Sequence, residues 1–331
     1  MPEKMRENAK FVIHSIDEYL GPSEHRFFGA GFKRSTYQIQ PHMDDGRLLA
    51  TVNVSYPTDW SLKQKETDLR PHLSTVDVMV LGVRSSEMLL RSVVGLTDRQ
   101  IDQAQIQKLV VRAGTRPEES LERLPLKAEL KKTAAVESSN NDQFDTTVTT
   151  QIGVMQATVV IRHEKPHAGD TELSEYSYIA GSSERYWGTG YRLREQNISN
   201  VAVDIESLSA KAEVAIRYEH DGGAGMKGSH TTGAATFIDA FVSLLQLGQV
   251  LLYELDGIDR GRSETLWMQR LVLRPSSHYE GRTSTADKAL AKLRITDHQL
   301  LALPSGKWRN VDFAGDVGGI DLSATFAHRI A

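Results

Sequence analysis

The amino-acid sequence predicts an α+β protein built from two copies of one domain, each a long buried helix wrapped by an antiparallel sheet. Three observations support this prediction: the halves of the chain repeat each other, each half contains one long apolar segment, and alternating strand patterns flank that segment. At 331 residues, the chain is long enough for two ordinary domains.

Internal repetition is the clearest signal in the chain. Residues 26–33, RFFGAGFK, recur as residues 185–192, RYWGTGYR, at an offset of 159. Further on the offset is 162, where residues 107–112 recur as residues 269–274. Because several blocks recur in the same order, we interpret the chain as an internal duplication.

The expected elements follow the same order in each copy. In the first copy they are an amphipathic helix over 9–20 ended by Gly21 and Pro22, strands over 32–40 and 48–56, a helix over 73–91, and strand segments over 106–112, 124–136 and 146–161. The second copy has its helix over 233–252. Both long helices are apolar around nearly the whole circumference, so we expect them to be enclosed. Ser74 and either Thr231 or Thr232 are the expected caps.

This element order, two strands, a buried helix and three strand segments, is that of the hotdog fold, so we predict a tandem (double) hotdog. The expected parts are a helical lead-in over 1–22 and hotdog-like domains over 23–165 and 175–331. A polar linker over 164–174 joins the two domains.

Composition narrows the function and the compartment. The formal net charge of −4 provides no field to attract a polyanion, so we expect no nucleic-acid partner. The absence of cysteine excludes thiolate nucleophiles and iron–sulfur sites, and it favours a reducing compartment. Residues 1–10 are too polar for a signal peptide. The most apolar stretch, 233–252, contains Asp239, so we expect a core helix, no membrane partner and a cytoplasmic protein.

Two short motifs favour structural interpretations. Residues 163–167 match the HExxH zinc pattern, but Pro166 breaks the helix that this pattern needs, so we expect no metal site. The glycine pairs that begin at Gly29 and Gly188 precede strands rather than helices, and we interpret them as turns or bulges.

Asp77 and Asp239 occupy equivalent positions in the two copies, each among apolar residues of the predicted helix. A buried carboxylate is costly unless it is paired, hydrogen-bonded or neutralised. Each aspartate is therefore either a hydrogen-bonded core carboxylate or a general acid/base with a raised pKa.

Histidines and glycines lie just before the long helices. His72 precedes the first helix, and His220 and His230 lie in the loop before the second. That loop contains Gly225, and Gly233 follows it, which would permit close backbone approach to a substrate. The alternatives are solvated histidines and an ordinary surface loop.

Residues 15–32, SIDEYLGPSEHRFFGAGF, resemble the opening of the avirulence-D (AvrD) family of syringolide-synthesis proteins. The resemblance implies a cytoplasmic enzyme of secondary metabolism, in a family associated with joining a β-ketoacyl thioester to a pentulose such as xylulose. Residues 233–241, GAATFIDAF, are similar to the helix of hotdog β-hydroxyacyl dehydratases, which pair an acidic residue there with a histidine in the preceding loop. A-factor synthases are a further, related comparison. Neither histidine spacing to Asp239 matches well.

Our leading hypothesis is a hotdog-type acyltransferase that condenses a β-ketoacyl thioester with a sugar-like hydroxyketone. The sites that it names are the catalytic candidates Asp239, His230, His220, Asp77 and His72, and the substrate-binding candidates Gly233, Phe237, Phe241 and Gly225. It needs no metal or cofactor, because acyl carrier protein or coenzyme A would present the donor. The alternatives are a hotdog dehydratase or thioesterase and a non-catalytic acyl-metabolite-binding protein, either as a monomeric pseudo-dimer or as a homodimer.

Overall fold

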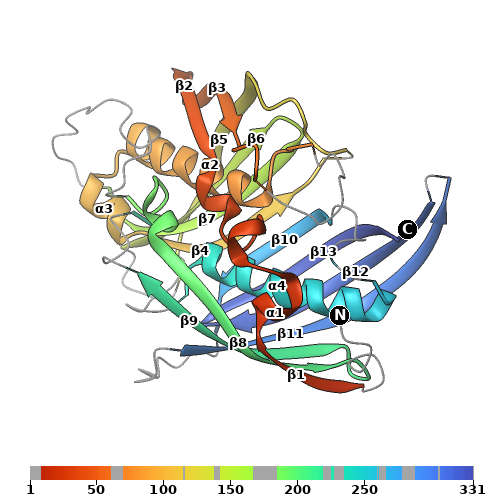
Figure 1. The fold of residues 1–331 in the computed structure, drawn as a ribbon. Helices are drawn as coiled ribbons and strands as arrows, with labels where there is room; N and C mark the ends of the chain where they lie inside the picture. The colour runs from red at the N-terminus through yellow and green to blue at the C-terminus, as the bar shows by residue number, and fades with distance from the viewer. Residues whose placement is uncertain are drawn as a thin grey trace.

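In the computed structural model, the chain forms one antiparallel sheet with 13 strands in the described residues (Figure 1). The structure describes residues 9–60, 70–114, 116–137, 142–166, 185–218, 225–226, 235–258, 260, 266–277, 288–304 and 306–330. The N-terminal segment contributes β1 (Lys10–Ser15) and α1 (Ile16–Leu20). The first half contains β2 (Thr36–Asp44), β3 (Arg47–Ser55), α2 (Thr75–Leu89), α3 (Asp98–Gln103), β4 (Gln105–Arg112), β5 (Leu124–Ala135), β6 (Gln143–Ile152) and β7 (Met155–Glu164). The second half contains β8 (Arg194–Asp204), β9 (Ser209–Tyr218), α4 (Phe237–Asp256), β10 (Trp267–Pro275), β11 (Lys288–Leu303), β12 (Gly306–Val317) and β13 (Ile320–Ile330).

The strands have the same spatial order in both halves. That order is β2-β3-β5-β6-β7-β4 in the first half and β8-β9-β11-β12-β13-β10 in the second. The halves meet where β4 pairs antiparallel with β10, and there Val110 lies opposite Val272, its counterpart at the offset of 162. The predicted α+β class with an antiparallel sheet is therefore confirmed. The sheet itself continues from one half into the other.

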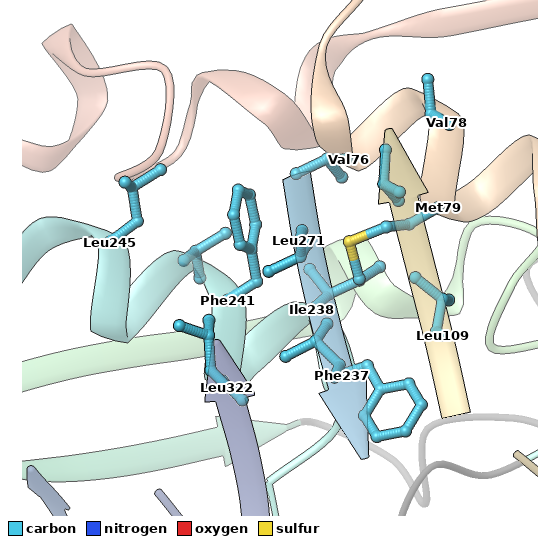
Figure 2. Close-up of a cluster of buried hydrophobic side chains, with 14 of the residues drawn as sticks. Val76, Val78, Met79, Leu109, Phe237, Ile238, Phe241, Leu245, Leu271 and Leu322 are labelled. Atoms are coloured by element: carbon cyan, nitrogen blue, oxygen red, sulfur yellow. The ribbon is translucent and has the colours of Figure 1, made fainter. Parts of the chain in front are cut away.

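The long helices α2 and α4 lie in the centre of the core. Every residue of α2 is buried, and α2 packs on β5, β6 and β7. The mostly buried α4 packs on β9, β11 and β13. Figure 2 shows Val76 and Met79 of α2 near Ile238 and Phe241 of α4, with Leu271 of β10 among them. Because these side chains belong to one cluster, the halves share a single hydrophobic core.

Within the described residues, α4 is the one helix long and apolar enough to cross a membrane by length and composition. In its most apolar window, 83% of the residues are buried inside the protein. This burial matches the expectation of a core helix.

The prediction of one helix over 9–20 is wrong for most of its length. Residues Lys10–Ser15 form β1, which pairs with β8, and only Ile16–Leu20 is helical. Phe11, Val12 and Ile13 favour an extended strand, and the free edge of β8 supplies its hydrogen-bonding partner. The expected end is confirmed, because Gly21 closes α1 with φ +83°.

Two boundaries in the predicted copies also differ. The segment 146–161 forms parts of two strands, because a turn at Gly153 (φ +52°) separates β6 from β7. The second long helix begins at Phe237 and its cap is Thr236 rather than Thr231 or Thr232. Ser74 caps α2 as expected, and Thr236 is its counterpart at the offset of 162.

Candidate active site

Asp77 is a hydrogen-bonded core carboxylate at the start of α2. Its Oδ2 accepts hydrogen bonds from the Ser74 amide at 2.8 Å and the Ser74 hydroxyl at 2.6 Å, and the Ser74 hydroxyl in turn accepts from the Asp77 amide, which completes a capping box. Tyr37 donates to its Oδ1 at 2.7 Å, and Tyr56 donates to its Oδ2. Burial and the neighbouring Asp77 charge raise the pKa of both tyrosines well above the ordinary value.

Asp239 has the same place at the start of α4 but a different set of donors. The Thr236 amide and hydroxyl each donate to Oδ2 at 2.8 Å, which forms the same capping box. Arg194 Nε donates to Oδ2 at 2.8 Å and Gln196 Nε2 to Oδ1 at 2.7 Å. Both members of the Asp239–Arg194 pair are buried. In each half the carboxylate oxygens are therefore engaged within the core, which favours the structural alternative for both aspartates.

A cavity of about 130 Å³ lies between the two halves, next to the first turn of α2. Its apolar lining comes from both halves and comprises Phe27, Phe28, Trp60, Leu73, Ala113, Pro117, Met155, Leu266, Trp267, Met268 and Phe326. Its polar lining comprises Arg26, His72, Ser74, Thr75, Arg116, Glu118, Gln246, Gln249, Tyr253 and Arg260. An apolar hollow with a few convergent polar groups has the character of a small-molecule site.

The first turn of α2 carries unbonded backbone donors beside this cavity, which Ser74 and Thr75 line. The Asp77 amide is bonded to the Ser74 hydroxyl and the Val78 amide to the Ser74 carbonyl, whereas the amides of Thr75 and Val76 have no acceptor among the described residues. Unpaired amides at a helix N-terminus favour a negative charge or an oxyanion.

His72 lies at the same end of the cavity. Its ring packs edge-on against Trp60 with the ring centroids 6.1 Å apart. Its Nδ1 lies 3.3 Å from the Arg70 carbonyl, and its own carbonyl accepts from Tyr56. No described residue bonds to Nε2, so His72 is the sequence-predicted catalytic candidate that the structure brings to the cavity.

The opposite wall comes from α4. Gln246 accepts a hydrogen bond from Arg26 and donates one to the Phe28 carbonyl at 3.1 Å. These bonds connect α4 to the turn over residues 26–31 of the first half, which we call the aromatic turn. Gln249, one helical turn further on, lines the cavity and is partly exposed. Residue patterns alone did not identify either glutamine as a site residue.

On α2, a charged residue occupies the position that corresponds to Gln249 of α4. Glu87, the counterpart of Gln249, is buried, and its Oε1 accepts from Arg185 at 3.2 Å and from the Met226 amide at 3.3 Å. Burial raises the pKa of Glu87, and Arg185 opposes that shift. Gly225 lies beside this carboxylate, since a Cβ there would be 3.0 Å from Glu87 Oε1.

The remaining predicted substrate residues are separated from the cavity or lie outside the described residues. Phe237 and Phe241 are fully buried core residues, and Phe241 packs edge-on against Phe28, with the ring centroids 5.7 Å apart. His220, His230 and Gly233 lie outside the described residues.

The HExxH pattern at 163–167 and the glycine pair that begins at Gly29 both serve the fold. His163 lies on β7 rather than on a helix, its Nε2 is 2.8 Å from Thr146 Oγ1, and burial lowers its pKa. The described part of the chain contains no group of three or more residues able to hold a metal ion. At Gly29 a Cβ would lie 2.3 Å from the Ser23 carbonyl oxygen, so this glycine is needed for a tight turn.

Several solved structures resemble the chain over most of its length. They include an acyl-CoA thioesterase II TesB2 from Mycobacterium marinum, at 10% identity and a TM-score of 0.38, covering 89% of this chain and 96% of that one. A MaoC-like dehydratase matches at 11% identity and a TM-score of 0.39, covering 77% and 83%. The pyran synthase domain from module nine of the sorangicin pathway matches at 13% identity and a TM-score of 0.38, covering 88% of this chain and 97% of that one.

No curated protein matches the chain in sequence. The model of one protein family does match it, over residues 11–331, and that family is described as Pseudomonas avirulence D protein (AvrD).

Proposed function

The chain belongs to the AvrD family, and from this premise we propose that it is a tandem hotdog enzyme that condenses a β-ketoacyl thioester with a sugar-like hydroxyketone. The repeated strand order and the pairing of Val110 with Val272 support the tandem arrangement, in which each half acts as the partner of the other. A single chain then suffices as a pseudo-dimer, working in the cytoplasm.

The observation that carries the proposal is the cavity between the halves. Its apolar wall, which includes Phe27, Met155 and Phe326, suits an acyl chain, and the first turn of α2 lies beside it. An acyl thioester bound there would direct its carbonyl oxygen to the amides of Thr75 and Val76. Acyl carrier protein or coenzyme A would present the donor.

His72 is the base that this geometry favours for acyl transfer. The acceptor hydroxyl oxygen attacks the thioester carbonyl carbon while His72 Nε2 takes the hydroxyl proton. The tetrahedral intermediate then breaks its carbon–sulfur bond, and the thiol leaves with the proton from His72. The oxyanion stays at the start of α2 throughout this sequence.

Ring closure is the second step of the proposed reaction. The methylene between the two carbonyl groups of the new ester loses a proton to the same histidine. The resulting carbanion attacks the ketone carbon of the acceptor, which forms the carbon–carbon bond, and the alkoxide recovers the proton. Atoms and charge balance without a further reactant.

The sequence alone favours Asp239 as the base, helped by His230 or His220, and this assignment is the alternative to His72. The four hydrogen bonds of Asp239, one from the buried Arg194, support a structural role better than a catalytic one. The corresponding first-half carboxylate, Asp77, does not line the cavity.

The test is product analysis by mass spectrometry after incubation with β-ketoacyl, β-hydroxyacyl and plain acyl thioesters, each with and without xylulose. The proposal expects a condensation product from the β-ketoacyl thioester and the sugar together, and its loss in His72→Gln. His42→Gln, at an exposed histidine on β2 outside the described lining of the cavity, is the matched control and should retain full activity. Dehydrated or hydrolysed products alone would indicate a dehydratase or thioesterase, and binding without any product would indicate a binding protein. Either result contradicts the proposal.

A further inference from the structure

Two guanidinium groups lie near each other at one wall of the cavity. Arg26 is buried, and its three nitrogen atoms donate to the Pro22 carbonyl, Gln246 and Asp17. Arg260 donates to the His25 carbonyl at 3.0 Å. Burial lowers the pKa of Arg26 and the positive charge of Arg260 lowers it further, whereas Asp17 and Glu24 oppose these effects. Two guanidinium groups therefore lie at the same wall of the cavity.

The charge lining the cavity is positive overall. Arg116, on the segment after β4, adds a third, exposed guanidinium group. Asp17 neutralises Arg26, and among the described residues that line the cavity Glu118 is the one with an acidic side chain. The Glu118 oxygens already accept from the amides of Ser120 at 3.3 Å and Val154 at 3.2 Å. An anion entering the cavity would gain electrostatic attraction from Arg116 and Arg260.

We propose that Arg260, assisted by Arg116, forms an anion-binding subsite of this cavity that takes a phosphate group carried by a substrate. The planar guanidinium fork matches phosphate oxygens in pairs and is the side chain best suited to this task. The inference rests on the proposed function for its ligand class. The phosphate belongs either to the phosphopantetheine arm of the donor or to a phosphate monoester of the hydroxyketone acceptor.

Calorimetric titration at low ionic strength tests the subsite with two pairs of probes. One pair is pantetheine and 4′-phosphopantetheine, and the other is a free ketopentose and its 5-phosphate. We expect the phosphorylated member of at least one pair to bind about tenfold more tightly, the size of one charge-assisted hydrogen bond. The pair that shows the preference identifies the source of the phosphate.

Variants then assign the preference to the two arginines. Arg260→Gln should abolish most of it, Arg260→Lys should retain part of it, and Arg116→Gln should reduce it. The matched control is Arg294→Gln, which removes an exposed guanidinium group on β11 outside the cavity and should leave the preference intact. Because surface charges are screened by salt, the preference in the native protein should also fall between 50 and 500 mM salt.

Equal binding within both pairs would overturn the inference, as would a preference that survives in both Arg260→Gln and Arg116→Gln. If Arg260→Gln fails to fold by circular dichroism, Arg116→Gln and the salt dependence decide. The product assay separates this inference from the proposed function. A phosphate preference without a condensation product would refute the proposed function and retain the anion-binding subsite. A condensation product without a phosphate preference would retain the proposed function and refute the subsite.

Discussion

The two long helices begin alike and are held differently. Asp77 and Asp239 each complete a capping box, yet hydroxyl groups of two tyrosines hold the first, and a guanidinium group and an amide hold the second. The capping geometry is the same in both halves. The residues that surround it differ, so carboxylates at equivalent positions lie in unlike electrostatic environments.

The same divergence separates the middle parts of the helices. Arg84 of α2 donates to the carbonyls of Trp187 and Gly188, whereas its counterpart Gln246 contacts the aromatic turn of the other half. The buried Glu87 forms an ion pair with the half-buried Arg185, whereas its counterpart Gln249 lines the cavity. The neutral glutamines of the second half therefore line the hollow beside the helix start of the first half, and their counterparts on α2 are charged.

The largest expected difference between the halves concerns the capping aspartates. Asp239→Asn should cost about 3–5 kcal/mol of unfolding free energy, because it breaks the buried ion pair with Arg194. Asp77→Asn should cost only about 1–2 kcal/mol, because its other partners are neutral hydroxyl and amide groups. Urea unfolding of both variants measures the difference, and equal losses would contradict the comparison.

A smaller difference is expected at the glycines where each helix approaches the sheet. A Cβ at Gly82 of α2 would lie 2.6 Å from the Ala157 Cβ on β7, so Gly82→Ala should cost about 1–3 kcal/mol. A Cβ at Gly248 of α4 would lie 3.1 Å from the end of the Phe313 ring, which can shift. The gain in helix propensity, about 1 kcal/mol, should then leave Gly248→Ala close to neutral. A thermal unfolding scan that ranks the two variants in the opposite order would refute this.

The smallest predicted effect is the contribution that Glu87 makes to the pH dependence of folding stability. Burial raises its pKa in the folded protein, so the folded state holds the proton more tightly than the unfolded state. The contribution of Glu87 to stability is complete below its pKa in the unfolded state, near 4.5. This contribution is lost as the pH rises through the raised pKa of the folded state. The groups that face it are Arg185 and, beyond that arginine, Asp102.

Replacing Glu87 by Gln should remove this slope. The stability of the native protein minus that of Glu87→Gln should therefore decrease as the pH rises above about 4.5, in urea titrations at a series of pH values. The exposed Glu206→Gln is the control and should show no such trend. A difference that stays flat or increases with pH would show that Glu87 is not held as described.

Much of the fold could be predicted because its signals are local or repeated. The apolar circumference of α2 and α4 identified two enclosed helices, and alternation identified most strands. The segment Lys10–Ser15 could not be assigned in the same way, since its strand depends on the distant edge of β8. Thr236 was overlooked as a cap although the offset from Ser74 pointed to it.

The site was less predictable than the fold. His72 could be selected because it immediately precedes a helix, and the structure brings it to the cavity. Gln249, Arg116 and Arg260 lack any motif, and they meet only because α4, β4 and the segment after α4 converge in space. The buried aspartates carried the strongest sequence signal, yet capping accounts for their burial.

The proposed place where the acyl thioester binds is the cavity at the start of α2. A crystal structure with a pantetheine β-ketoacyl amide, in which nitrogen replaces the thioester sulfur, tests this most directly. We predict the acyl carbonyl oxygen within hydrogen-bonding distance of the Thr75 or Val76 amide, and the chain against Phe27, Met155 and Phe326. The analogue bound at the start of α4 beside Glu87, or away from both helix starts, would contradict the account.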